Sequence, residues 1–139
     1  MRIWIKAYAV TVLVMLVLDS AWLSLVGPRL YRPLLAPLLR PGFALGPALT
    51  FYAVYVVGIL GLAVAPALPR RSGRTWGSRR GVAGRGALLG LVAYATYDLT
   101  NQATLRGWPL TITLADLAWG TLLTATSAWA GYTVARRPR

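Results

Sequence analysis

The chain has 139 residues, is 57% hydrophobic with a mean hydropathy of +0.57, and carries a formal net charge of +12. This composition is too apolar for an ordinary soluble domain and fits a small polytopic membrane protein with one domain. The absence of Cys and His excludes disulfides, thiol nucleophiles and metal sites built on His or Cys. The basic residues flank apolar segments, and no aromatic–basic platform accompanies them, so we expect no nucleic-acid partner.

Four apolar stretches are long enough to cross a membrane. They cover residues 3–26, 46–68, 86–105 and 110–135. An α-helix rises 1.5 Å per residue, so about 20 residues cross a hydrocarbon core of roughly 30 Å. The sequence therefore predicts an all-α fold in which residues 1–139 form a single domain, an antiparallel bundle of four transmembrane helices.

The connections differ in character. Four prolines and interspersed apolar side chains in residues 27–45 predict a short interfacial helix in the first loop. Pro69 ends the second stretch, and the Gly-, Ser- and Arg-rich segment 70–85 predicts a solvated loop. Residues 106–109 predict a tight turn.

The basic residues predict an orientation. The N-terminus contributes two Lys or Arg, the second loop six and the C-terminus three, which makes eleven on one side of the membrane. The first loop contributes three and the last turn one, which makes four on the other side. The positive-inside rule then places both termini in the cytoplasm and fits a multi-pass protein of a bacterial cytoplasmic (inner) membrane.

All three acidic residues, Asp19, Asp98 and Asp116, lie inside apolar stretches, and none lies in a loop. A carboxylate in the middle of a bilayer costs roughly 2.5–3.5 kcal/mol on insertion scales. With the predicted topology, all three lie roughly 10 Å below the outer surface. This agreement in depth predicts one shared intramembrane site. Three carboxylates this close cannot all ionise cheaply, so we expect them to titrate as a coupled group.

Each acid has a polar or aromatic neighbour three residues later. Asp19 precedes Trp22, Asp116 precedes Trp119, and Asp98 precedes Asn101. Residues at this spacing share one helix face. We expect Asp98 to be the principal charge, oriented by Asn101, with Asp19 and Asp116 tuning its proton affinity and Arg106 partly neutralising the group. The candidate binding or proton-linked residues are Asp19, Trp22, Tyr94, Tyr97, Asp98, Asn101, Asp116 and Trp119.

Small residues predict close helix contacts. Gly86 and Gly90 form a GxxxG step, and Gly58 and Gly61 lie in the second stretch. We interpret them as packing positions, within one bundle or across a dimer.

Several blocks resemble a family of small bacterial membrane proteins described only as predicted membrane proteins with a domain of unknown function. The blocks are Asp19-Ser-Ala-Trp22-Leu23, Tyr31-Arg32-Pro33, Phe51-Tyr52-Ala-Val-Tyr55-Val-Val-Gly58, the long segment Gly90 to Leu105 with Trp108-Pro109, and Asp116-Leu-Ala-Trp119-Gly120. The resemblance covers nearly the whole chain. It implies a four-span bundle and no established activity.

Three functions fit these residues. The first is binding or transport of a small solute, a cation or protons from the outer side. Because one short chain makes a thin conduit, this function is compatible with a homodimer. The second is a membrane enzyme acting on a lipid or isoprenoid through carboxylate acid–base or Mg²⁺ chemistry. The third is an accessory subunit of a membrane complex. Besides the lipid bilayer, the sequence names no partner and no cofactor.

Overall fold

The computed structural model of the protein describes residues 2–69 and 76–136, and these ranges contain helices and no strands. The all-α prediction is therefore confirmed. The elements in chain order are α1 (Arg2–Leu25), η1 (Gly27–Tyr31), α2 (Arg32–Leu35), α3 (Leu45–Gly58), η2 (Ile59–Val64), η3 (Ala65–Ala67), α4 (Arg79–Thr104) and α5 (Leu110–Arg136).

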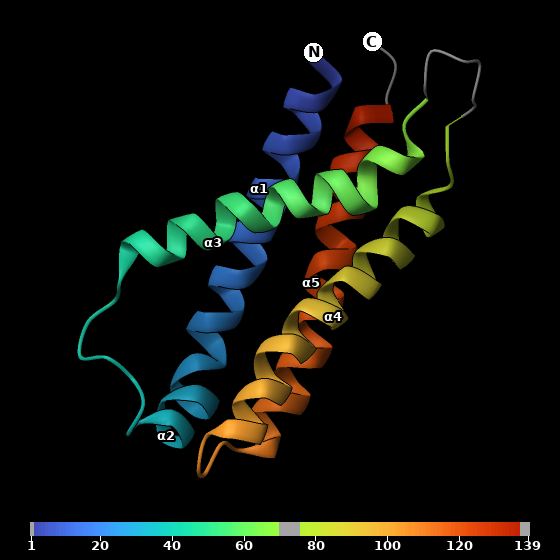
Figure 1. The fold of residues 1–139 in the computed structure, drawn as a ribbon. Coiled ribbons are helices and arrows are strands. Elements are labelled where there is room, and N and C mark those ends of the chain that lie inside the picture. The colour runs from blue at the N-terminus through green and yellow to red at the C-terminus, as the bar shows by residue number, and fades with distance from the viewer. Residues whose placement is uncertain (1, 70–75, 137–139) are drawn as a thin grey trace.

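Helix α5 is the centre of the fold. It packs along α4 on one side and along α1 on the other, and its contact with α4 is the most extensive in the molecule. Figure 1 shows that α5 runs antiparallel to both neighbours and that the two ends of the chain lie at the same end of the bundle. The η1–α2 segment and the turn between α4 and α5 lie at the opposite end (Figure 1).

Glycines allow α5 to approach its neighbours closely. Gly90 on α4 faces Gly120 on α5, and a Cβ atom added to Gly90 would overlap the Gly120 carbonyl oxygen. On the other side of α5, a Cβ atom added to Gly131 would overlap the Thr11 hydroxyl of α1. Gly86 also faces the α5 backbone. The GxxxG step is therefore confirmed as a packing position within the chain. Gly58 and Gly61 have no atom this near, so they make no such close contact within the described chain, and a packing role for them across a dimer stays a prediction.

The second apolar stretch differs from the straight helix expected for 46–68. Helix α3 changes into the wider π-helical turns of η2 and then into the tighter η3. Pro66 explains the change, because its ring lacks an N–H and clashes with the carbonyl group four residues earlier. The Arg85 Nε–H of α4 donates a hydrogen bond at 3.0 Å to the Ala63 carbonyl oxygen in η2.

Helix α3 crosses the bundle obliquely instead of lying along it (Figure 1). The η2 segment packs on both α4 and α5, whereas α3 makes its main bundle contact with α1. The N-terminal part of α3 therefore stands apart from α4, and this leaves room for a pocket between them.

Two loop predictions need correction. Helix α4 begins at Arg79, seven residues before the expected start at Gly86, because the Ser78 hydroxyl caps it by accepting a hydrogen bond from the Gly81 amide at 2.9 Å. Residues 70–75 of the predicted solvated loop lie outside the described residues.

The helix expected in the first loop is present as η1 and α2. It packs on the protein, since Leu35 is buried against the start of α5.

The bundle has an apolar core with polar groups inside it, and many of its large apolar side chains are exposed. Buried polar residues include Thr11, Thr124 and Ser127, whereas Leu13, Leu122 and many similar side chains are exposed. Monomeric soluble proteins rarely expose so many large apolar side chains together. By length and composition alone, Ile3–Leu25 and Leu45–Ala67 are the two described helical stretches that could cross a membrane.

We predict that Gly90→Ala destabilises the fold. The added methyl group meets the Gly120 carbonyl group, and such overpacking costs roughly 1–3 kcal/mol. Gly84→Ala is the matched control, because nothing lies within 4 Å of a Cβ atom there. Thermal unfolding of both variants in nanodiscs checks this. Equal unfolding temperatures for the two variants would contradict the close approach of α4 and α5.

Candidate functional site

All three acidic side chains are buried in the protein. Asp98 on α4 is 0% exposed, Asp19 on α1 is 8% exposed and Asp116 on α5 is 9% exposed. They lie toward the end of the bundle that carries η1 and the α4–α5 turn. Since a buried carboxylate needs a donor or a counter-charge, the partners of each one show what the site can do.

Asp19 accepts two hydrogen bonds from different helices. The Tyr52 hydroxyl of α3 donates to Asp19 Oδ2 at 2.5 Å, and the Trp119 indole N–H of α5 donates to Oδ1 at 3.1 Å. Both carboxylate oxygens are therefore satisfied. These two bonds connect α1 to α3 and to α5.

Asp116 is held by a residue from the first loop. The Tyr31 hydroxyl of η1 donates to Asp116 Oδ1 and accepts a hydrogen bond from the Trp22 indole N–H at 2.9 Å. Burial, followed by the bond to Asp116, raises the pKa of the Tyr31 phenol above its usual value. The hydroxyl therefore keeps its proton and remains a donor to Asp116 at neutral pH.

Two tryptophans join these hydrogen-bond networks. Trp22 and Trp119 stack with ring centroids 4.4 Å apart and an angle of 7° between their planes. Trp22 donates to Tyr31, which in turn donates to Asp116, and Trp119 donates directly to Asp19. The two Asp-x-x-Trp segments thus meet through their stacked rings, and the tryptophan of each segment is hydrogen-bonded, directly or through Tyr31, to the aspartate of the other.

Asp98 differs from the other two acids. Both of its carboxylate oxygens are buried and accept no hydrogen bond. Its carboxyl group lies within hydrogen-bonding reach of the Asp116 carboxyl group, and no basic group among the described residues acts on either of them. Asn101 therefore does not orient Asp98, and the exposed Arg106 does not neutralise the pair. Two adjacent carboxyl groups without a cation require a proton or another positive charge between them.

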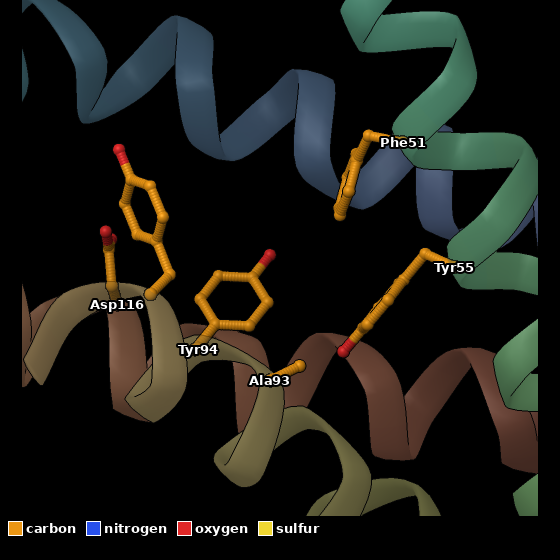
Figure 2. Close-up of a pocket in the computed structure, with 6 residues that line it drawn as sticks. Phe51, Tyr55, Ala93, Tyr94 and Asp116 are labelled. Atoms are coloured by element: carbon orange, nitrogen blue, oxygen red, sulfur yellow. The ribbon is translucent and has the colours of Figure 1, made fainter. Parts of the chain in front are cut away.

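A pocket of about 370 Å³ opens beside these acids. Figure 2 shows Phe51 and Tyr55 projecting from α3 toward Tyr94 on α4, with Asp116 beyond Tyr94. Ala93 and Tyr97 of α4 complete the lining. The pocket is therefore aromatic, and Asp116 is the one charged side chain that the described part of the chain contributes to its lining.

The family described as "Predicted membrane protein (DUF2177)" matches residues 4–133, which is nearly the whole chain. The chain belongs to this family. Neither a curated protein nor a solved structure matches it. Membership establishes a predicted membrane protein of unknown function, and the residues that carried the resemblance lie in and around the pocket and the hydrogen-bond networks just described.

The structure of this family member brings together most of the expected site residues. Asp19, Trp22, Asp116 and Trp119 take part in the connected networks, and Asp98 and Tyr94 lie beside them. Tyr97 lines the pocket but is 59% exposed and packs on Trp108. Asn101 is half-buried and interacts with Tyr97 instead of with Asp98.

Sequence reasoning missed the role of Tyr31. It lies in the first loop, far from Asp116 in the sequence, and its apolar neighbours indicated only an interfacial helix. Its position between Trp22 and a proline-rich segment is the signal that could have drawn attention to it. Tyr52 appears in the sequence analysis only within the block Phe51 to Gly58 that resembles the family, and its bond to Asp19 depends on the oblique course of α3.

The described part of the chain contains no group of three or more acidic residues close enough together to hold a metal ion. The three carboxyl groups therefore form a pair, Asp98 with Asp116, and a separately satisfied Asp19.

We predict that Tyr31→Phe destabilises the protein by roughly 1–3 kcal/mol, because it leaves a buried carboxylate oxygen and the Trp22 indole N–H without partners. The control is Tyr8→Phe, since Tyr8 is exposed. Thermal unfolding measures the stability, and the tryptophan emission of Tyr31→Phe should differ from that of wild type, because Trp22 loses its hydrogen-bond partner. Identical spectra and stabilities for the two variants would exclude the Tyr31 bridge.

Proposed function

We propose that this protein is a membrane-spanning binding or transport protein whose Asp98–Asp116 pair takes up a proton or a small cation. The observation that carries this proposal is the fully buried Asp98 carboxyl group, which accepts no hydrogen bond and lies beside a second carboxyl group. A purely structural carboxylate would be expected to have a donor, as Asp19 does.

The surroundings of the Asp98–Asp116 pair favour a proton or cation that is bound and released over a basic residue that neutralises the pair permanently. The positive charges nearby in the sequence, such as Arg106, are exposed at the bundle end. The Tyr31 hydroxyl holds one oxygen of Asp116 and leaves the rest of the pair free. Intramembrane acids that lack a basic partner commonly serve ion pathways and proton relays. Since the pocket reaches Asp116, a solute can approach the pair from one side.

We further propose that all four long helical stretches cross the membrane with both termini in the cytoplasm, in a bacterial inner membrane. Helices α4 and α5 have 26 and 27 residues, enough to cross a hydrocarbon core of roughly 30 Å. The start of α1 and the end of α5 lie at one end of the bundle (Figure 1). In the sequence, eleven of the fifteen basic residues belong to the N-terminal, second-loop and C-terminal segments. The pocket and acids would then lie toward the outer side.

We predict that Asp98→Asn abolishes a pH-dependent change in tryptophan fluorescence of the protein in nanodiscs. The Trp22–Trp119 stack is connected to Asp116, so a change of charge on the Asp98–Asp116 pair should alter its emission. Titration of wild type and variant, with and without Na⁺ and Mg²⁺, measures the change. Stabilisation by one of these ions alone would identify that ion as the bound species.

Asp98→Glu is the matched control, because it keeps a carboxyl group and should keep the pH-dependent signal. Thr100→Val, at an exposed position on the same helix, should behave like wild type. A flat fluorescence curve in wild type, or the same curve in wild type and Asp98→Asn, would remove the proposed function.

We predict that single cysteines report the four-span topology. The chain has no native Cys, so Ser78→Cys and Gly42→Cys each introduce one labelling site in a different connection. In intact cells, a membrane-impermeant maleimide should label Gly42→Cys and should label Ser78→Cys only after the membrane is opened. Labelling of both sites in intact cells would contradict the proposed orientation.

A further inference from the structure

We propose that the aromatic pocket beside Asp116 binds an organic ammonium ion, a positively charged nitrogen that carries apolar substituents. This inference rests on the proposed function and names the class of ligand for the same site. It is carried by the shape, lining and charge of the pocket.

The lining is made of aromatic rings on two helices. Phe51 and Tyr55 stack on α3 with ring centroids 5.3 Å apart and an angle of 23° between their planes. Tyr94 faces them from α4 (Figure 2), and Tyr97, one helical turn further along α4, also lines the pocket. Aromatic faces attract cations electrostatically, and several rings around one space form the cages that recognise substituted ammonium groups.

The charge in the lining of the pocket is negative. Among the described residues, Asp116 is the one charged residue in its lining, and Tyr31 occupies only one of the Asp116 oxygens. A cation in the pocket would therefore meet a carboxylate at the end next to the acid pair. The titratable groups that face Asp116 are Asp19, Tyr31, Tyr94, Tyr97 and Asp98. None of them is basic, so none competes with the ligand for Asp116.

The chemistry of the lining favours an organic cation over an inorganic one. Small metal cations require several oxygen ligands to replace their water shell, and the pocket offers one carboxylate and phenol oxygens. A substituted ammonium ion is weakly hydrated and requires no ring of ligands. The volume of about 370 Å³ lies in the usual range for small-molecule sites, roughly 300–1,000 Å³.

The ligand and a proton would compete for the same carboxyl pair. A cation beside Asp116 balances its charge and removes the need for a proton between Asp116 and Asp98. Binding of the cation should therefore release protons and should become tighter as the pH rises from acidic to neutral. This links the pocket to the proton site without any large rearrangement of the helices.

The test is calorimetric titration of the full chain, in uncharged detergent micelles, with benzyltrimethylammonium. Its neutral isostere neopentylbenzene has the same shape without the charge. We expect saturable binding of the cation at neutral pH, weaker binding at acidic pH, and no comparable binding of the isostere after subtraction of protein-free micelles. No binding of the cation, or equal binding of cation and isostere, would overturn the proposal.

Two pairs of variants locate the binding. Phe51→Leu should weaken cation binding by about 2- to 30-fold, because it removes one aromatic face, whereas Phe51→Trp keeps a face and should bind at least as well as wild type. Asp116→Asn keeps an acceptor for Tyr31 and should weaken binding about tenfold or more, whereas Thr96→Val on the exposed face of α4 should not. Unchanged affinity in both Phe51→Leu and Asp116→Asn would exclude the pocket as the site.

The ammonium group could belong to a free solute or to a lipid headgroup, and a competition experiment distinguishes them. Displacement of the probe by short-chain phosphatidylcholine, but not by phosphatidylglycerol, assigns a lipid, whereas displacement by neither assigns a free solute. The two proposals can also fail separately. If Asp98-dependent fluorescence titration is present without cation binding, only the ligand class is wrong, whereas loss of the titration itself removes the proposed function.

Discussion

The burial of three carboxyl groups, which have no basic partner within residues 2–69 and 76–136, determines how this bundle is built. A buried acid must find donors or keep a proton, and here the donors come from phenols and indoles on other elements. Tyr52, Tyr31 and Trp119 therefore connect helices that share few other polar contacts. The first loop, which has little reason to be ordered by itself, is held against α5 through the Tyr31–Asp116 bond and the burial of Leu35.

Much of this arrangement could be predicted from the sequence because intramembrane acids are costly. Three acids inside apolar stretches and none outside them marked a site, and helical rise placed them at one depth. The structure places Asp98 beside Asp116 and connects Asp19 to the same networks through the Trp22–Trp119 stack. The GxxxG step was also recognisable, because glycine has no side chain and so allows the backbones of two helices to approach closely.

The rest depended on three-dimensional features that periodicity does not contain. The roles of Tyr31 and Tyr52 follow from the fold of a loop and from the oblique course of α3, which Pro66 and the π-helical η2 accompany. Asn101 shares a face with Asp98 by spacing alone, yet it interacts with Tyr97, since i and i+3 positions are neighbours without being bonded. The early start of α4 was hidden because the Gly- and Arg-rich composition near Ser78 resembles a loop, while one side-chain cap is enough to begin a helix.

The central position of α5 has a consequence for biosynthesis. Helix α5 packs on both α1 and α4, whereas these two make little contact with each other, and α5 follows both in the chain. While the ribosome is still synthesising residues 110–136, α1 and α4 lack the partner that joins them. Asp19 then has no Trp119 to bind, and Asp98 has no Asp116 beside it. The bundle can therefore be completed only late, and two acid-bearing helices lack their common partner until the last helix has been made.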